Sequence, residues 1–342
     1  MQRFRAGGQK SEQQLLTIVA GALAVLLTSF CGWEGPPPRV PKTRPPQPPM
    51  MQEIYSIVLS ALSPDGTLVA GANRESSTIK ISKVPDNRIP VAILTPDCPI
   101  QGRFKALFSP DSSRLAFMCW DRRLAVWDFR NSKTEYLPLW QDTQAGQIAW
   151  SNDSKFLAAA AYSGRIKIWN RGGPESREFA TSLNAPLDKL LFTGEGHLLI
   201  SDARGKVSVW NRSGQQQNSA DFGGAISGLL ALPNGNQVLV VLSSNMADVS
   251  KPSKVLLWDI SAGTRNSVKG IDAYNPHPLA FSANGEYLVV QFNEGASAVF
   301  SMVQNRYVKS LSTDSLVTQG AFSSDGTIAL MGKTVSMWHC CP

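Results

Sequence analysis

The sequence predicts an all-β fold built from seven repeated units, preceded by a membrane-inserting helix and a Pro-rich linker. Three observations predict it: an uncharged apolar run near the N-terminus, a proline-dense stretch after it, and a turn motif that recurs at regular spacing to the chain end. The predicted boundaries are 1–14 for a short basic tail, 15–33 for the helix, 34–51 for the linker and 52–342 for the repeats.

The first element is the run from Leu15 to Trp33, which holds 19 residues without a charge. As a helix it spans roughly 28 Å at ~1.5 Å per residue, close to the thickness of a bilayer core. Basic residues precede it, as they precede the apolar part of an export signal: Arg3, Arg5 and Lys10. We therefore expect an uncleaved signal anchor and a single-pass membrane protein, with the repeats on the exported, extracytoplasmic side.

An alternative for this element is acylation of Cys31, as in a bacterial lipoprotein. Phe30 stands where a lipobox carries a small residue, so the signal anchor is the first choice. The linker follows, with eight prolines among residues 36–49. Such a stretch adopts extended polyproline II at ~3.1 Å per residue, roughly 40 Å in all, and is typical of a stiff spacer.

The repeats are marked by a polar tetrad that occurs seven times at spacings of 46, 42, 42, 39, 50 and 41 residues. Each tetrad has the composition of a tight turn, because Pro presets φ, Asp or Asn binds its own backbone and Gly accepts a positive φ. The tetrads begin at Ser63, Ser109, Ser151, Thr193, Leu232, Ser282 and Ser323.

A short apolar strand follows each tetrad, and a polar turn and an alternating strand follow that. In five repeats the alternating strand closes on a tryptophan: Trp127, Trp169, Trp210, Trp258 and Trp338. Short strands separated by turn signals, without helical periodicity, indicate an all-β fold. Four strands in about 42 residues form one propeller blade, so the sequence predicts a seven-bladed β-propeller.

The repeats resemble the WD-repeat family. Trp127-Asp128 and Trp258-Asp259 match its signature dipeptide, and Trp169-Asn170 and Trp210-Asn211 nearly match it. The first, sixth and seventh repeats depart from it, and the family's Gly-His dipeptide does not occur in its usual place in the repeat. The resemblance covers residues 52–342 and implies that Met50–Tyr55 supply the outermost strand of the last blade, which closes the ring.

The sequence contains none of the usual catalytic or nucleotide-binding motifs. The three histidines, His197, His277 and His339, are far apart, and no Cys-x-x-Cys pair exists, so no local zinc site can form. We expect no enzyme activity, no catalytic residues, no metal and no cofactor. Of the net charge of +7, about +4 lies in the first 50 residues, which argues against a nucleic-acid partner for the repeats.

The five cysteines are interpreted as buried or free thiols. The alternative is a disulfide in an oxidising compartment that involves Cys340 or Cys341 and ties the chain end to Cys31 or Cys98.

The candidate binding residues lie in the turns between the second and third strands of the blades. These turns carry arginines in the first four repeats and a longer loop, 243–254, in the fifth. Long loops in a compact array are often functional. The candidates are Arg74, Arg122, Arg123, Arg165, Arg204, Met246, Lys251 and Lys254.

These residues predict a basic rim that binds an acidic segment of a partner protein. The predicted function is a membrane-tethered interaction scaffold, as a subunit of or adaptor for a membrane or envelope complex. The alternatives are a propeller lipoprotein, a sensor of small ligands or peptides in the envelope and, last, a propeller enzyme.

Overall fold

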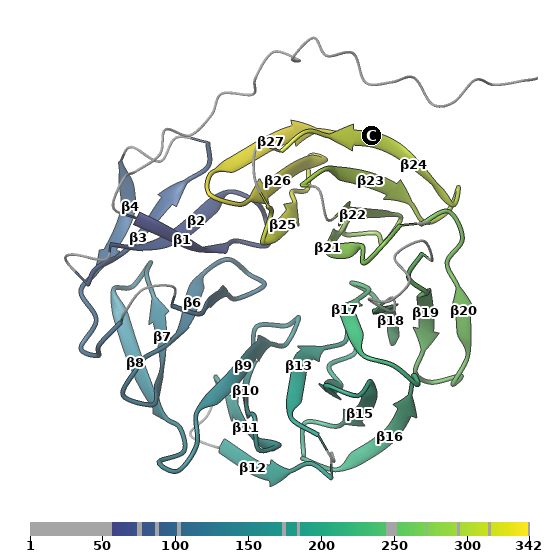
Figure 1. Cartoon of the computed structure of the whole chain (residues 1–342). Helices are drawn as coiled ribbons and strands as arrows, with labels where there is room; N and C mark the ends of the chain where they lie inside the picture. The colour runs from purple at the N-terminus through teal and green to yellow at the C-terminus, as the bar shows by residue number, and fades with distance from the viewer. Residues whose placement is uncertain are drawn as a thin grey trace, which may run out of the picture. The chain divides into compact units, whose positions relative to one another are not determined.

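Seven antiparallel sheets are arranged around one axis in the computed structural model (Figure 1). The structure describes residues 57–73, 77–85, 89–100, 104–172, 176–182, 185–243, 252–271, 273–292, 295–313 and 316–340. Six sheets have four strands in sequence order, and the described part of the seventh has three. The first strand of each sheet lies nearest the axis and the last lies at the periphery (Figure 1). The predicted seven-bladed β-propeller is therefore confirmed.

The strands of the first four blades are β1 Ile57–Leu62, β2 Leu68–Asn73, β3 Ile79–Lys83 and β4 Pro90–Leu94; β5 Ala106–Phe108, β6 Arg114–Met118, β7 Arg123–Asp128 and β8 Lys133–Pro138; β9 Ala145–Trp150, β10 Phe156–Ala161, β11 Arg165–Asn170 and β12 Ser176–Ala180; β13 Leu187–Phe192, β14 Leu198–Asp202, β15 Lys206–Trp210 and β16 Gln216–Asp221. Those of the last three are β17 Ile226–Ala231, β18 Gln237–Leu242, β19 Val255–Asp259 and β20 Arg265–Ser267; β21 His277–Phe281, β22 Tyr287–Gln291, β23 Ser297–Ser301 and β24 Arg306–Leu311; β25 Gln319–Phe322, β26 Thr327–Met331 and β27 Val335–His339.

The core consists of seven apolar clusters, and each cluster lies between two neighbouring blades. Successive side chains of a strand point to opposite faces of its sheet, so one strand serves two clusters. In β10, Leu157 and Ala159 pack against the second blade, whereas Ala158 and Ala160 pack against the fourth. The second strand of each blade is buried on both faces, which explains its nearly continuous apolar sequence.

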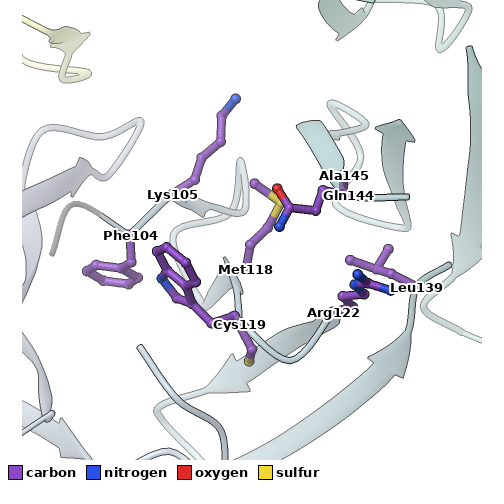
Figure 2. Close-up of a pocket in the computed structure, with 9 residues that line it drawn as sticks. Phe104, Lys105, Met118, Cys119, Arg122, Leu139, Gln144 and Ala145 are labelled. Atoms are coloured by element: carbon purple, nitrogen blue, oxygen red, sulfur yellow. The ribbon is translucent and has the colours of Figure 1, made fainter. Parts of the chain in front are cut away.

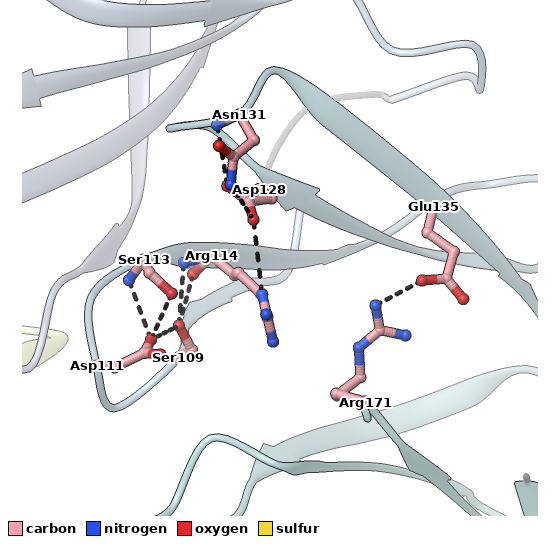
Figure 3. Close-up of polar contacts among 8 residues, drawn as sticks. All are labelled: Ser109, Asp111, Ser113, Arg114, Asp128, Asn131, Glu135 and Arg171. Carbon is pink, nitrogen blue, oxygen red and sulfur yellow. Dashed lines mark hydrogen bonds and ion pairs between the residues drawn. The ribbon is translucent and has the colours of Figure 1, made fainter. Parts of the chain in front are cut away.

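The tetrads form the turns between the first and second strands of all seven blades. In the second blade, Ser109 Oγ donates to Asp111 Oδ1 at 2.5 Å, and the backbone N–H of Ser113 donates to the same oxygen at 3.1 Å (Figure 3). The fourth residue has a positive φ in every tetrad, including Ser112 and Ser154, where serine replaces the usual glycine. The positive φ thus recurs in all seven turns, and the hydrogen bond from the serine hydroxyl to Asp or Asn occurs in the first, second, third, sixth and seventh blades.

Ion pairs reinforce the blades on the same side as the tetrads. Arg114 lies 3.9 Å from Asp128, the acidic residue of the Trp-Asp dipeptide, within one blade (Figure 3). Arg171 reaches Glu135 of the preceding blade at 2.5 Å (Figure 3). The Arg171 guanidinium lowers the pKa of the Glu135 carboxyl. Polar contacts between blades thus supplement the apolar clusters.

The predicted N-terminal elements and the donor of the last blade's fourth strand, Met50–Tyr55, lie outside the described residues. Within the residues that the structure describes, no helix has the length and apolar character needed to span a membrane.

Candidate functional site

The turns between second and third strands, together with the connections from each blade to the next, form one face of the ring, here called the upper face. The tetrads lie on the opposite, lower face, because successive strands of a sheet run in opposite directions. All the predicted binding residues that the structure describes belong to the upper face: Arg122, Arg123, Arg165, Arg204 and Lys254.

Arg123 is held by its own blade. Its Nη2 lies 2.6 Å from Asp121 Oδ2, and its guanidinium carbon lies 4.5 Å from the centre of the Tyr136 ring. It also donates to the backbone carbonyl of Asp97, and the Asp121 carboxylate raises its pKa. Arg123 therefore joins two loops of the upper face, and its charge is already matched.

Arg165 forms ion pairs with two carboxylates. Its Nη1 lies 2.8 Å from Asp142 Oδ1, and its Nη2 lies 2.6 Å from Glu178 Oε1. The indole N–H of Trp140 donates to the same Glu178 oxygen at 2.8 Å. The hydrogen bond from Arg165 is the main cause of the lowered pKa of Glu178. Arg165 therefore also stabilises the fold and leaves little charge for a partner.

The remaining described basic residues of the predicted rim are exposed. The side chains of Arg122, Arg204 and Lys254 form no ion pair with another described residue. The other predicted members, Arg74, Met246 and Lys251, lie outside the described residues. Within the described structure, the predicted rim therefore retains three exposed basic side chains without an ion pair, one each on the second, fourth and fifth blades.

A hollow of about 200 Å³ lies beside Arg122, between the second and third blades. In Figure 2, Phe104 and Lys105 lie on one side, Leu139 and Arg122 on the other, and Met118 between them. The remaining lining residues come from the turn after β6 and from the start of β9: Cys119, Trp120, Gln144 and Ala145. The hollow is therefore lined by apolar and polar surface in about equal parts, with basic groups at its margin.

Lys105 connects this hollow to the inner strands. Its Nζ donates to the Gly146 carbonyl and to Gln147 Oε1, both at 2.6 Å. Partial desolvation and the nearby Lys189 lower the pKa of Lys105. Asp188 acts in the opposite direction, so Lys105 places one positive group at this side of the hollow.

Two large aromatic side chains are exposed near the hollow. Trp120 is 61% exposed, and Tyr162, in the corresponding turn of the third blade, is 56% exposed. The Tyr162 ring lies against Gly146, so closely that a Cβ at position 146 would be 2.7 Å from it. Exposed Trp, Tyr and Arg together are the residue types that dominate protein interfaces.

Trp120, Tyr162 and Lys105 are not among the binding residues predicted from the sequence. A signal for the first two exists in the repeat, because Trp120-Asp121-Arg122-Arg123 corresponds to Tyr162-Ser163-Gly164-Arg165 in the next blade. An aromatic residue thus occupies the same turn position in consecutive blades. Lys105 offers no comparable signal, since its role depends on the neighbouring blade.

The cysteines that the structure describes are disulfide-bonded and are not the thiols that the sequence predicted. Cys98 and Cys119 form a disulfide with a Cα–Cα distance of 5.8 Å, and both are buried. The suggested link from the chain end to Cys98 is therefore wrong, because Cys119 occupies that position. Cys340 is also disulfide-bonded, whereas Cys31 and Cys341 lie outside the described residues.

In the part of the chain that the structure describes, no group of three or more His, Cys, Asp or Glu side chains is arranged to hold a metal ion.

The ring of seven sheets makes this protein a β-propeller, and its candidate site is a surface hollow suited to a partner. The protein-family model described as "WD domain, G-beta repeat" matches residues 144–170, which include the first three strands of the third blade. The third blade thus matches a WD repeat, and the seven sheets give the described chain the architecture of a β-propeller. Propellers of this kind typically act as non-enzymatic scaffolds for protein–protein interactions.

Two curated relatives are similar over part of the chain. Coronin-7 of Rattus norvegicus is 26% identical over 140 residues, which cover 39% of this chain and 15% of the relative. Coronin-7 of Homo sapiens is 25% identical over 145 residues, which cover 41% of this chain and 15% of the relative. Both matches are thus confined to a small part of proteins much longer than this one.

Proposed function

We propose that this protein is a membrane-tethered interaction scaffold whose upper face receives an acidic segment of a partner protein. The observation that carries this proposal is the exposed, unpaired Arg122 beside the exposed Trp120, at the margin of a hollow that also offers apolar side chains. An exposed Arg next to an exposed aromatic group supplies charge and apolar area together, as interface anchors do.

The tether belongs to the same proposal. Residues 15–33 form the anchor and 36–49 the spacer, with the propeller on the exported side. The Cys98–Cys119 disulfide supports export, because disulfides persist in oxidising compartments and are rare in the cytosol. Mass spectrometry of the mature N-terminus tests the tether: an intact N-terminus supports the anchor, and a lipid on Cys31 supports the lipoprotein alternative.

Partner binding is tested by cross-linking the full-length protein in its native membranes and identifying the captured proteins. The test variant combines Arg122→Glu, Arg204→Glu and Lys254→Glu on the upper face. The matched control combines Arg130→Glu, Lys133→Glu and Lys155→Glu, which reverse three exposed charges near the lower face. We expect the upper-face variant to lose a cross-linked partner that the control retains; equal capture by both variants would refute the proposal.

A further inference from the structure

We propose that the hollow between the second and third blades binds one large apolar side chain of a partner segment, while an adjacent carboxylate of that segment pairs with Arg122. This inference rests on the proposed scaffold function and deepens it, because it names the site and the chemistry of the partner. The partner is a linear peptide segment with Asp or Glu next to a bulky apolar residue.

The size of the hollow fits a side chain rather than a whole ligand. Sites for drug-sized molecules measure about 300–1,000 Å³, whereas this hollow measures about 200 Å³. An apolar cavity of about 150 Å³ already admits a benzene molecule in another protein. Phe104, Met118 and Leu139 supply apolar surface around the hollow, so the side chain of Leu, Met or Phe is a suitable occupant.

The charge of Arg122 is available to such a segment. Asp121, its neighbour in the turn, is paired with Arg123 at 2.6 Å. Asp142, in the connection to the next blade, is paired with Arg165 at 2.8 Å. These two carboxylates are thus engaged by other arginines, and Lys105 adds a second positive group on the far side of the hollow. A peptide carboxylate complements this arrangement, and a basic peptide is repelled.

The backbone conformation of Arg122 also supports a binding role for this residue. Arg122 has a φ of 65°, and the corresponding turn positions of the third, fourth and sixth blades are Gly164, Gly205 and Gly295, with φ between 83° and 90°. A residue with a side chain is disfavoured in this conformation, and such residues concentrate at binding sites. Arginine therefore replaces the glycine of the repeat in the turn that borders the hollow.

The aromatic groups complete the site. Trp120 lines the hollow and remains 61% exposed, which leaves its indole face free to cover a bound side chain. Rigid aromatic groups lose little conformational entropy on binding and are frequent interface anchors. The Cys98–Cys119 disulfide directly precedes Trp120 in the chain, so the turn is fixed before a partner arrives.

The test is selection of a random seven-residue peptide library, displayed on phage, against the full-length protein in lipid nanodiscs. Selected peptides are then measured by fluorescence anisotropy against three variants. Trp120→Ala removes the aromatic wall, and Arg122→Gly removes the charge while keeping a residue that suits the turn. Arg130→Gly is the matched control, because Arg130 is an exposed arginine in a turn of the same blade on the opposite, lower face.

We expect selected peptides to share a bulky apolar residue next to Asp or Glu. Their affinity should fall by about tenfold or more in Trp120→Ala and Arg122→Gly and stay within about twofold in Arg130→Gly. Absence of enrichment, enrichment of basic or neutral sequences, or equal binding to Arg122→Gly would overturn the inference. Equal losses in Arg122→Gly and Arg130→Gly would also overturn it, because binding would then depend on the total positive charge rather than on this site.

The two proposals fail in distinguishable ways. If membrane cross-linking depends on the upper face but the selected peptides do not require Arg122, the scaffold function stands and the hollow is not its site. If cross-linking does not depend on the upper face either, both proposals fail.

Discussion

Arg122 carries a conformational cost that can be measured apart from any binding role. At a φ of 65° an arginine is less stable than a glycine by about 1 kcal/mol, since its Cβ crowds the following carbonyl. We expect Arg122→Gly to raise the free energy of unfolding by roughly 1 kcal/mol in urea titrations.

The reciprocal change is the control for this prediction. In Gly164→Arg, the new Cβ would lie 2.7 Å from Thr181 Oγ1 at a φ of 85°, so this variant should be less stable than wild type. A loss of stability in Arg122→Gly would mean that the arginine side chain supports the turn. The positive φ of Arg122 would then no longer support its assignment to binding.

The tetrad carboxylates give the fold a dependence on acid pH. The Ser323 hydroxyl and the Thr327 backbone N–H donate to Asp325 and lower its pKa from 3.8 to about 2. Because the folded pKa is below the unfolded one, the contribution of Asp325 to stability is complete above about pH 4 and is lost as the pH falls toward 2. Similar hydrogen bonds lower the pKa values of Asp65, Asp111 and Asp153.

We expect urea midpoints measured from pH 2 to pH 5 to rise with pH, and Asp325→Asn to make that rise smaller. Ser323→Ala should move the pKa of Asp325 back toward its ordinary value, which carboxyl NMR titration detects directly. An unchanged pKa in Ser323→Ala would show that the hydroxyl does not hold the carboxylate.

At the level of single elements, the connection between the first two blades is fixed covalently. The Cys98–Cys119 disulfide closes a loop over a sequence separation of 21 residues and joins that connection to the turn of Trp120 and Arg122. A disulfide over a loop of this length stabilises a fold by ~3 kcal/mol, mainly by restricting the unfolded chain. We expect Cys98→Ala/Cys119→Ala to unfold at a lower urea concentration by a free-energy difference of that order.

Both proteins are compared without reductant, because Cys340 is also disulfide-bonded and its reduction would confuse the comparison. Peptide mapping under non-reducing conditions checks the linkage independently. Recovery of Cys98 and Cys119 as free thiols from the wild type would rule out the disulfide, and with it the support that it gives to export.

Elements were predictable from sequence where their cause is local. Each tetrad determines its own turn. The strands on either side of the turn are recognised from nearby apolar residues and from their alternation with polar residues. The site was less predictable, because its chemistry depends on residues from different loops. Arg165 is neutralised by Asp142 and Glu178, at sequence separations of 23 and 13, and the hollow needs two blades. A turn arginine alone gives no sign of whether a distant carboxylate will pair with it.

At the level of the whole molecule, the seven clusters are alike in kind, but one junction differs in connectivity. Six pairs of neighbouring blades are joined by the chain, whereas β25 and β1 meet across about 260 residues of sequence. The apolar cluster at this junction contains Leu62, Val69, Ala329 and Met331. The ring is therefore held at this point by noncovalent contacts among the described residues of its first and last blades.

Gln319 supplies the polar part of this junction. Its Oε1 accepts from the backbone N–H of Leu62 at 2.8 Å, and its Nε2 donates to the Ser60 carbonyl at 3.2 Å. Leu62 is buried, so truncation in Gln319→Ala leaves a donor without a partner in the interior. We expect a loss of about 1–3 kcal/mol in the free energy of unfolding. Hydrogen exchange should also quicken at the Leu62 amide.

Gln147→Ala is the matched control, because Gln147 joins blades that the chain already connects: it donates to the Asp188 carbonyl and accepts from Lys105 Nζ, both at 2.6 Å. The loss of stability should be smaller there, since the carbonyl oxygen and the exposed Lys105 ammonium find other partners more readily than an enclosed N–H does. If the closing junction is the weakest, exchange in Gln319→Ala will quicken first in β1 and β25 and leave β9 and β13 unchanged. Equal quickening in all blades would instead mean that the ring opens as one cooperative unit, in which the position of the chain ends has no energetic consequence.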